Sequence, residues 1–435
     1  MVMLSPRREV GEFRKRYKWM ALVVSIVFLA LVGRMVQLQL VQREHWSAIA
    51  RENITKTFRL PATRGIVRDA RGRLVASNRP SYDVYLTPQL LSPEDIDLLC
   101  ELMDLDPDER AHLRRRIAAI PLHRRMHQIE MFRDIDRDQM AAIETHQNDL
   151  RGLDVLPRPV RLYPYGALGA HAVGYLNEVS AEDLERLAED YGPGDVVGRM
   201  GVERAWEDQL RGQRGFRRVL VDARGRRQRN ATQLAAEREE VNPPAPGHDL
   251  VLSLDMELMR SIEHAFAGHP AGSAVVIDVK SGRVRALFSK PTYDLNQISN
   301  GISHAAYDEL RADPFRPLID KTIYESYFPG STFKPISALA ALGDSILNPS
   351  DRVECIGYYT VGNDTRPKLC TSAHGEVDMR TALVQSCNVY FYKLAEQVGL
   401  ERLNRQARGF GLGQRTGIGI NSEARGFLAT REWYE

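Results

Sequence analysis

The chain has 435 residues, of which 43% are hydrophobic and 27% are charged, and its formal net charge is +2. This length is sufficient for two or more domains. The composition argues against a disordered chain and against a nucleic-acid-binding protein. The four cysteines are few, and three of them fall between positions 355 and 387.

The N-terminal region predicts a single membrane anchor. Residues 1–18 are rich in lysine and arginine, and residues 19–40 are mostly apolar, with one interruption at Arg34. A bilayer core needs about 20 helical residues, and a basic flank stays in the cytoplasm. We therefore expect a cytoplasmic tail at 1–18, an anchor at 19–40 and the remainder outside. A cleaved signal peptide is the main alternative, although no small-residue cleavage pattern follows the apolar run. A buried helix of a soluble protein is the other.

The next part of the chain predicts a hairpin and then helices. Residues 65–69 alternate as a strand does, a turn follows, and residues 73–76 continue as a second strand. Residues 91–156 carry leucines and charged residues at helical spacing. We interpret their arginine clusters as solvated helix faces, with a partner-binding surface as the alternative. His171 is expected to be a hydrogen-bonded structural residue rather than a metal ligand or a base.

A proline-rich stretch at 236–248 predicts a domain boundary, because proline at this density resists packing into a helix or a central strand. Beyond it, residues 249–255 read as a strand and residues 256–266 as a helix. Two paired strands are expected at 273–278 and 284–289. This order fits an α+β domain in which helices pack on an antiparallel sheet.

The stretch around Ser331 carries the strongest chemical signal. A Pro-Gly turn precedes an alanine-rich run that predicts a helix through Leu342, so Ser331 lies near the helix N-terminus. Lys334 follows on the same face, and a lysine with a pKa lowered by burial can be the base that a serine nucleophile needs. The helix N-terminus would favour an acyl oxyanion. The alternative, an N-cap serine beside a solvated lysine, is weakened by Ser386 and Asn388 downstream.

These residues resemble the transpeptidase domain of the class B penicillin-binding proteins. That family combines Ser-x-x-Lys with Ser-x-Asn and Lys-Thr-Gly elements, and the chain has the first two in the same order. The likeness includes residues 327–335, residues 386–393 and a glycine-rich tail that ends near Trp433. The chain is similar above all to the elongation-specific monofunctional members, from about residue 19 to its last residue.

The resemblance implies an α+β protein with one N-terminal transmembrane helix. An elongated pedestal domain of the dimerisation type would occupy 41–245, with a helical head inserted at about 80–157. A penicillin-binding transpeptidase domain would occupy 246–435. In the pedestal, the arginine and aspartate residues of the first hairpin are expected to form structural ion pairs, and Arg161 is expected to pair with Glu203.

The resemblance also implies a D,D-transpeptidase that cross-links peptidoglycan during cell elongation. Ser331 would attack the penultimate D-Ala carbonyl of a stem peptide, and Lys334 would take its proton. Ser386 would relay a proton to the leaving amine, and Asn388 would orient Lys334 and the substrate amide. β-Lactams would acylate the same serine, and no organic cofactor is implied.

The expected partners are peptidoglycan stem peptides, β-lactams, a membrane glycosyltransferase of the shape and elongation type, and other elongation-complex proteins. The chain would sit in the bacterial inner membrane with its bulk in the periplasm, and nucleic acid is not an expected partner. A septal transpeptidase, a β-lactam sensor and a non-catalytic scaffold are the alternatives. The long region between the anchor and Ser331 argues against the sensor, and the run 386–392 favours the elongation enzyme over the septal one.

The third element of the family, Lys-Thr-Gly, does not occur before Glu435. The nearest string, at 415–417, stands too early in the chain. We therefore expect a C-terminally truncated chain that is inactive as it stands, and whose full-length form is an enzyme.

The cysteine cluster predicts a structural zinc site. Cys355, Cys370, His374 and Cys387 together supply three thiols and an imidazole, a sufficient set for tetrahedral zinc. Cys387 lies between Ser386 and Asn388, so alternation along an extended chain would turn it away from the active site. A Cys355–Cys370 disulfide and simple buried thiols are the alternatives.

Overall fold

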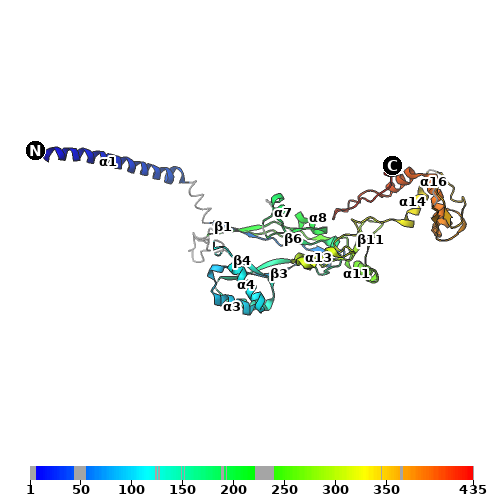
Figure 1. Ribbon diagram of the computed structural model, residues 1–435, viewed down its shortest axis with the longest axis horizontal. Helices are drawn as coiled ribbons and strands as arrows, with labels where there is room; N and C mark the ends of the chain where they lie inside the picture. The colour runs from blue at the N-terminus through cyan, green and yellow to red at the C-terminus, as the bar shows by residue number, and fades with distance from the viewer. Residues whose placement is uncertain are drawn as a thin grey trace. The chain divides into compact units, whose positions relative to one another are not determined.

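The computed structural model describes residues 6–43, 55–122, 125, 128–147, 149–150, 152–187, 191–192, 194–220, 240–343, 345–362 and 366–434 (Figure 1). The chain divides into two compact units, one of residues 1–63 with 212–246 and the other of residues 64–211 with 247–435. Parts of the predicted tail (1–5) and of the predicted boundary (236–239) lie outside the described residues.

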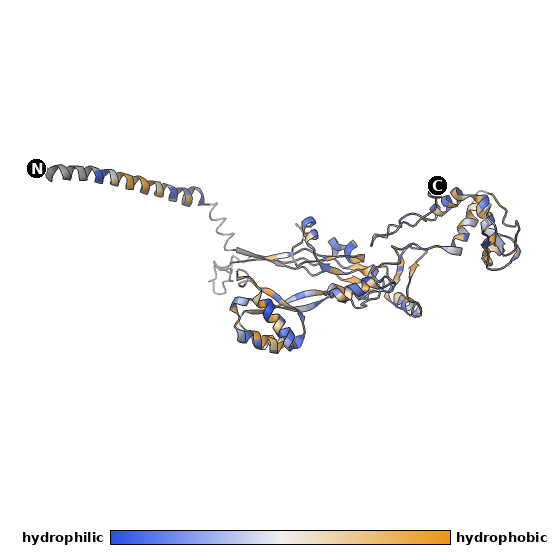
Figure 2. Ribbon diagram, in the orientation of Figure 1, coloured by the Kyte–Doolittle hydropathy of each residue, from blue (hydrophilic) through white to orange (hydrophobic). Residues whose placement is uncertain are grey.

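The first unit begins with the long helix α1 (Pro6–Val36), which continues into the π-helical turn η1 (Gln37–Val41). The span Arg16–Leu40 is long and apolar enough, by length and composition, to cross a membrane. Figure 2 shows this apolar run along α1. Arg34, which interrupts it, donates from Nη1 to Gln37 Oε1 at 2.7 Å. The guanidinium of Arg34 therefore has a hydrogen-bond partner within the same helical segment.

Three antiparallel strands belong to the same unit, in the order β1–β8–β9. They are β1 (Thr55–Leu60), β8 (Gly215–Leu220) and β9 (Glu240–Asn242). The central strand β8 pairs with β1 from Leu60↔Gly215 to Thr55↔Leu220, and with β9 at its other edge. This sheet was not predicted, because its strands are joined only by pairing over long sequence separation.

The second unit is organised around β3 (Leu74–Leu86), the strand with the most partners in a five-stranded sheet. The predicted hairpin is confirmed, because β2 pairs antiparallel with β3 through Val67 and Ala76. On the head side, β3 lies between β4 and β5, both antiparallel to it. The partner strands are β2 (Val67–Arg68), β4 (Ile129–Ile135), β5 (Leu153–Leu162) and β10 (Leu250–Val251), the last parallel to β2.

The head consists of helices packed on the distal part of β3, β4 and β5. Its helices are α3 (Pro93–Leu102), α4 (Pro107–Ala118) and α5 (Arg137–Thr145), with the short turn η2 (Pro88–Leu90) before them. Each of the three helices starts with a capping box, at Ser92, Asp106 and Asp136, which satisfies free N–H groups of the first turn. The helices were predicted, but β4 and β5 were not, since their pairing with β3 overrides the local pattern.

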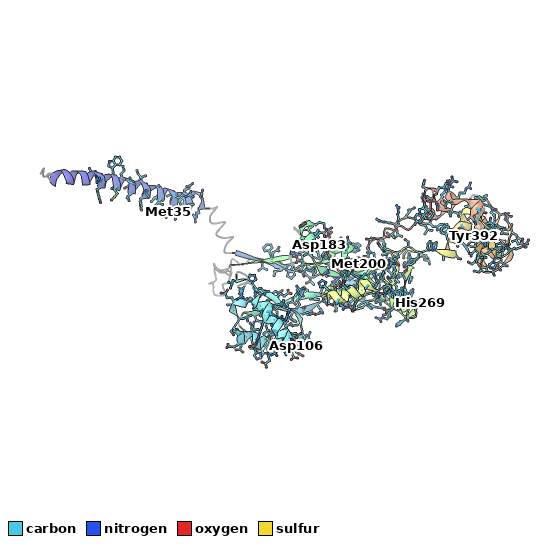
Figure 3. All side chains as sticks on the ribbon, in the orientation of Figure 1. Met35, Asp106, Asp183, Met200, His269 and Tyr392 are labelled. Carbon is cyan, nitrogen blue, oxygen red and sulfur yellow. The ribbon has the colours of Figure 1, made fainter. Side chains whose placement is uncertain are left out.

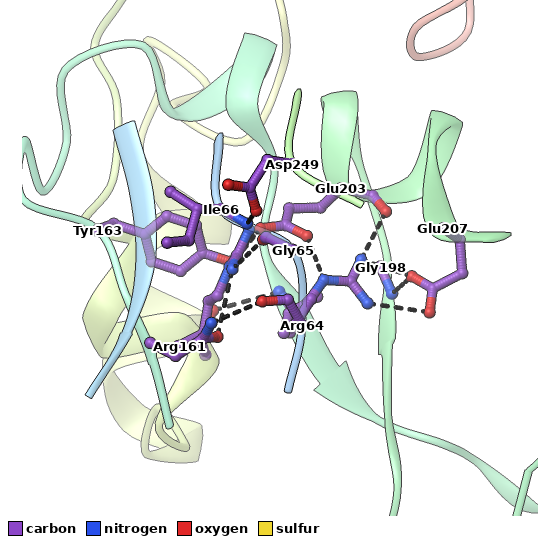
Figure 4. A network of polar contacts seen from close by, with 12 residues as sticks. Arg64, Gly65, Ile66, Arg161, Tyr163, Gly198, Glu203, Glu207 and Asp249 are labelled. Atoms are coloured by element: carbon purple, nitrogen blue, oxygen red, sulfur yellow. Dashed lines mark hydrogen bonds and ion pairs between the residues drawn. The ribbon is translucent and has the colours of Figure 1, made fainter. Parts of the chain in front are cut away.

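A buried ion network joins the pedestal segments (Figure 4). Arg64 donates from Nε to Glu203 Oε2 at 2.7 Å and from Nη2 to Glu207 Oε2 at 2.7 Å. Arg161 Nε donates to Glu203 Oε1 at 2.7 Å, which confirms the predicted pair. Glu203 is fully buried, so each oxygen of its carboxylate is matched by a guanidinium, as a buried charge requires.

Asp69 in the first hairpin differs from the expected ion pair. Its carboxylate accepts the backbone N–H groups of Arg71 and Arg73 at 2.9 Å and that of Met256 at 3.3 Å. Arg71 instead pairs with Asp255 at 2.8 Å. Asp69 therefore caps the turn of the hairpin and also binds the first residue of the distant helix α11 (Met256–Ala265).

Short elements complete the pedestal. They are α6 (Ala170–Val173), β6 (Leu176–Glu178), α7 (Ala181–Arg186), β7 (Val196–Gly198), α8 (Gly201–Ala205) and α9 (Glu207–Leu210). Within α6, the buried His171 donates from Nε2 to the Pro317 carbonyl at 2.7 Å, since a carbonyl can only accept. This confirms its predicted structural role.

The part of the chain that carries Ser331 begins with α11 (Met256–Ala265) and the antiparallel strands β11 (Gly272–Ile277) and β12 (Val284–Lys290), all as predicted. Its other helices are α12 (Leu295–Ser299), α13 (His304–Ala312), η4 (Gly330–Phe333), α14 (Lys334–Gly343), α15 (Met379–Val384), α16 (Asn388–Val398), α17 (Leu400–Gly409) and α18 (Arg431–Tyr434). Four short strands, β13 (Val353–Cys355), β14 (Tyr358–Tyr359), β15 (Lys368–Leu369) and β16 (Gly375–Val377), pair as β13–β16 and β14–β15.

Candidate active site

Ser331 lies in a 3-10 turn that leads into helix α14. Gly330 before it has φ of +58°, a left-handed conformation that glycine adopts without steric cost. The turn ends at Phe333, and Lys334 is the first residue of α14. Ser331 is exposed and Lys334 is half-buried. After the Pro-Gly turn, the serine is therefore exposed to solvent and the lysine is partly covered.

The Lys334 ammonium makes three hydrogen bonds in the site. Nζ donates to Ser386 O at 2.6 Å, to Ser386 Oγ at 3.0 Å and to Asn388 Oδ1 at 2.7 Å. Burial lowers the pKa of Lys334, although negative charge on the Cys370 and Cys387 thiols would raise it. A lysine with a lowered pKa is more readily available as the free amine, the form that can accept a proton.

Ser386 links the lysine to the serine. It follows α15 with φ of +52°, a conformation that is uncommon for residues other than glycine. This backbone turns its hydroxyl toward Ser331, with 2.9 Å between the two Oγ atoms. A continuous hydrogen-bonded path therefore runs from Ser331 through Ser386 to Lys334. All four predicted catalytic residues, Ser331, Lys334, Ser386 and Asn388, are brought together.

The hairpin of β14 and β15 supplies contacts that sequence reasoning missed. Asn388 Nδ2 donates to the Leu369 carbonyl at 3.2 Å, and Asn388 N–H donates to Cys370 Sγ at 3.1 Å. The hairpin also packs on α16, where Tyr392, labelled in Figure 3, stacks on Tyr359 with ring centroids 6.5 Å apart. The contact from Leu369 to Asn388 is made by a backbone carbonyl, which carries no sequence signal.

The predicted zinc ligands also converge. The His374 Nδ1 lies 3.6 Å from Cys355 Sγ and 3.5 Å from Cys370 Sγ, and Cys370 Sγ lies 4.0 Å from Cys387 Sγ. One ligand atom from each of the four residues lies within 4.8 Å of the others. All four cysteines of the chain are free thiols, so the alternative Cys355–Cys370 disulfide is not formed.

The chemistry of this cluster suits a cation. Burial opposes ionisation of Cys370, but backbone N–H groups of Val389, Asn388 and Ser372 lower its pKa to about 6. Burial is the main cause that raises the pKa of Cys387 to about 12, with the neighbouring thiols adding to it. Ionisation of Cys370 is thus favoured and ionisation of Cys387 is opposed, as expected for sulfurs held close together.

Two family models match the chain: the penicillin-binding protein dimerisation domain over residues 59–252 and the penicillin-binding protein transpeptidase domain over residues 272–435. The chain belongs to the penicillin-binding proteins. Among the relatives of this penicillin-binding protein is the peptidoglycan D,D-transpeptidase MrdA of Escherichia coli strain K12. The two are 32% identical over 426 residues, which make up 95% of this chain and 65% of the relative. The chain thus spans 65% of the length of that relative.

Solved structures of penicillin-binding proteins have the same fold. One, a complex between PBP2 and MreC from Helicobacter pylori, is 26% identical, has a TM-score of 0.74, and the match covers 88% of this chain and 70% of that one. Another, described as the structural coordination of polymerization and crosslinking by a peptidoglycan synthase complex, is 28% identical with a TM-score of 0.65. That match covers 96% of this chain and 71% of that one.

Proposed function

We propose that the protein is a peptidoglycan D,D-transpeptidase of the elongation type that acts through an acyl-enzyme on Ser331. The observation that carries this proposal is the hydrogen-bonded path from Ser331 through Ser386 to Lys334, with Asn388 on the far side of the amine. The similarity to D,D-transpeptidase MrdA supports the choice of reaction.

In acylation, the proton of the Ser331 hydroxyl passes to Ser386 Oγ as the proton of Ser386 passes to the free amine of Lys334. The Ser331 Oγ then attacks the carbonyl of the penultimate D-Ala, and the electron pair of the carbonyl moves to its oxygen. The backbone N–H of Ser331, at the start of the helix, stabilises this oxyanion. Lys334 is now an ammonium, and Asn388 Oδ1 holds it in place.

The leaving group takes the proton back along the same path. The Lys334 ammonium donates to Ser386, which donates to the departing amine of the terminal D-Ala, so the carbon–nitrogen bond breaks and the acyl-enzyme remains. An amine of a neighbouring stem peptide then attacks the ester by the reverse sequence of proton transfers. A β-lactam follows the first half of this course and stays bound to Ser331.

The same reasoning extends to location and partners. We infer a single-pass inner-membrane protein with residues 1–18 in the cytoplasm, because a basic flank precedes the apolar span Arg16–Leu40. The related H. pylori protein forms a complex with MreC, and another relative belongs to a peptidoglycan synthase complex. These relatives support a membrane glycosyltransferase and other elongation proteins as partners of this chain.

Covalent labelling tests the proposed nucleophile. Membranes that contain the natural protein are treated with a fluorescent penicillin, and the labelled peptide is mapped by mass spectrometry. We expect the label on Ser331, its absence in Ser331→Ala, and slow labelling in Ser386→Ala because the proton path is broken. Thr332→Val is the matched control, since the Thr332 hydroxyl donates only to the Pro329 carbonyl. A label on another residue, or unchanged labelling of Ser331→Ala, would contradict the proposal.

We further propose that Cys355, Cys370, His374 and Cys387 hold a structural zinc ion. Tetrahedral zinc with thiolate bonds of about 2.3 Å places its ligand atoms roughly 3.5–4 Å apart, close to the observed separations. The second ring nitrogen of His374, Nε2, lies 3.0 Å from Ser372 Oγ. Such a partner fixes the ring so that Nδ1 faces the sulfurs. A bound cation would also stabilise the three neighbouring thiolates.

Metal analysis tests this second proposal. The protein purified without chelator should contain about one zinc per chain, and Cys355→Ser or His374→Ala should lose it. Cys100→Ser is the matched control, because Cys100 is buried in the head, away from the cluster. Chelator should remove the zinc and lower the melting temperature, whereas reductant alone should do neither. Zinc-free protein with four thiols that react freely would overturn the assignment.

A further inference from the structure

The side chain of Asn421 binds three separate segments of the chain. Its Oδ1 accepts the Gly201 N–H at 2.6 Å, and its Nδ2 donates to the His171 carbonyl at 2.8 Å and to Asp320 Oδ2 at 3.0 Å. A backbone N–H can only donate and a carbonyl can only accept, so these partners fix the orientation of the amide. Both N–H donors and the carbonyl oxygen of the side chain are used.

The backbone at this position also favours asparagine. Asn421 has φ of +55°, a conformation that asparagine and glycine adopt more readily than other residues. Its neighbour Ile420 is buried in a cluster that includes Val202 and Ile323, and Ala424 N–H donates to the Ile323 carbonyl at 3.0 Å. The residues around Asn421 therefore contact both the pedestal, at Val202, and the segment after Asp320, at Ile323.

Two of the three partners lie in the pedestal. Gly201 has φ of +60°, and a Cβ there would lie 2.5 Å from the Ala172 carbonyl oxygen, so this backbone has little room to move. His171 also holds the Pro317 carbonyl through Nε2. The pedestal therefore grips the chain before Ser331 at two points, directly at Pro317 and through Asn421 at Asp320.

The third partner, Asp320, stabilises a turn in the chain before Ser331. Asp320 is 3% exposed, and its Oδ1 accepts the Thr322 N–H at 3.0 Å and the Thr322 hydroxyl at 2.5 Å. Its carbonyl accepts the Tyr324 N–H at 2.9 Å. This capped turn is followed by Glu325, which pairs with Arg316, and then by the exposed stretch that ends at Ser331.

We propose that Asn421 is a positioning residue for the acylation of Ser331. By joining His171 and Gly201 to Asp320, it fixes the start of the segment that leads to the serine, so that the pedestal sets where this segment begins. Rate constants for covalent catalysis depend steeply on such placement, since a displacement of about 1 Å can cost about 100-fold. This inference rests on the proposed function, because it concerns the rate of the same serine.

The test compares the kinetics of penicillin labelling in the natural protein and in three variants at position 421. Asn421→Gly retains the backbone preference and loses the three side-chain bonds. Asn421→Asp retains the shape, loses both donors and places a carboxylate against Asp320. Asn421→Ala loses the side chain and also adds the backbone cost.

Asn404→Ala is the matched control, because Asn404 Nδ2 in α17 donates to the Ala429 carbonyl at 2.6 Å.

We expect the acylation rate constant of Asn421→Gly to fall about tenfold or more, while all of the protein is still labelled at the end. Asn421→Asp should be slower still, and the addition of Asp320→Asn should restore part of the rate by removing the repulsion. Asn404→Ala should react as the natural protein does. A purely structural role would lower the labelled fraction and leave the rate constant of the remaining protein unchanged.

Two outcomes would overturn the inference: unchanged rate constants in the Asn421 variants, or a loss confined to the final extent of labelling. The labelling site in the unsubstituted protein separates this question from the proposed function. If that protein is not labelled on Ser331, the proposed function fails first. If it is labelled there and the Asn421 variants react at the same rate, only the positioning role fails.

Discussion

A single amine, that of Lys334, connects most of the candidate site. Its three hydrogen bonds reach the backbone and side chain of Ser386 and the side chain of Asn388, and Ser386 passes the connection on to Ser331. The need for a serine nucleophile with a nearby base could be predicted from sequence, because the chemistry requires those residue types. The left-handed backbone of Ser386 and the carbonyl of Leu369 could not, since both depend on how distant segments meet.

The state of Lys334 predicts how acylation depends on pH. Burial lowers its pKa from the ordinary 10.5, and only the free amine can accept a proton. The rate of penicillin labelling should therefore rise with pH and level off above the lowered pKa, at a pH below the ordinary 10.5. The measurement is the labelling rate at each pH.

Lys334→Arg provides the control for this dependence. It keeps the positive charge but cannot lose a proton, so its rate should fall about 100-fold or more and lose the rise with pH. A natural protein whose rate is flat or falls with rising pH would show that Lys334 is not the base.

At the level of elements, helices and hairpins that depend on neighbouring residues could be predicted from the sequence. The helices of the head were predicted from residues at helical spacing, and the β2–β3 hairpin and the pair β11–β12 were predicted from alternation and turn residues. The strands β4 and β5 and the sheet of β1, β8 and β9 were not. Their residues become strands through pairing with partners far away in the sequence, which no local pattern encodes.

The pedestal network predicts a large loss of stability when the charged Glu203 is replaced by an uncharged residue. Glu203→Gln would remove the carboxylate that Arg64 and Arg161 share, at a position that is fully buried. Breaking a buried pair in this way costs about 3–5 kcal/mol, a sizeable part of a typical stability of about 5–15 kcal/mol. The measurement is the denaturant midpoint of the detergent-solubilised protein.

Asp97→Asn is the control for that measurement, because Asp97 pairs with Arg114 where both side chains are more than half exposed. Exposed pairs contribute about 1 kcal/mol or less. Equal midpoints for the two variants would mean that the network does not stabilise the pedestal.

At the level of the whole molecule, α1 is the helix that could anchor the chain in a membrane. Its apolar span was predicted because length and composition are sufficient to recognise it. The catalytic chemistry proposed for Ser331 needs access to the cell wall, and a membrane anchor would keep the site within reach of it. The anchor and the site are therefore parts of one functional proposal, although each is tested separately.

Arginine in the middle of the span should release the protein from the membrane. Each such residue at a helix centre opposes insertion by about 2.5–3.5 kcal/mol, so the double variant Phe28→Arg and Leu29→Arg should move from the membrane fraction to the carbonate-soluble fraction. Arg34→Leu should stay in the membrane. Mass spectrometry of the natural protein should find residues 1–18 still attached, and a mature N-terminus between residues 34 and 50 would establish a cleaved signal instead.

The strand β3 constrains how this protein can change during evolution. Near its start, Val75 and Ala76 belong to a core that also contains Met256 of α11, and near its end Val84 and Leu86 belong to the core of the head. One added or deleted residue between them would reverse the facing of every side chain beyond it. Substitutions can accumulate along this strand, but its length is fixed by two cores at once. Lineages that lengthen or shorten the protein should therefore do so outside residues 74–86.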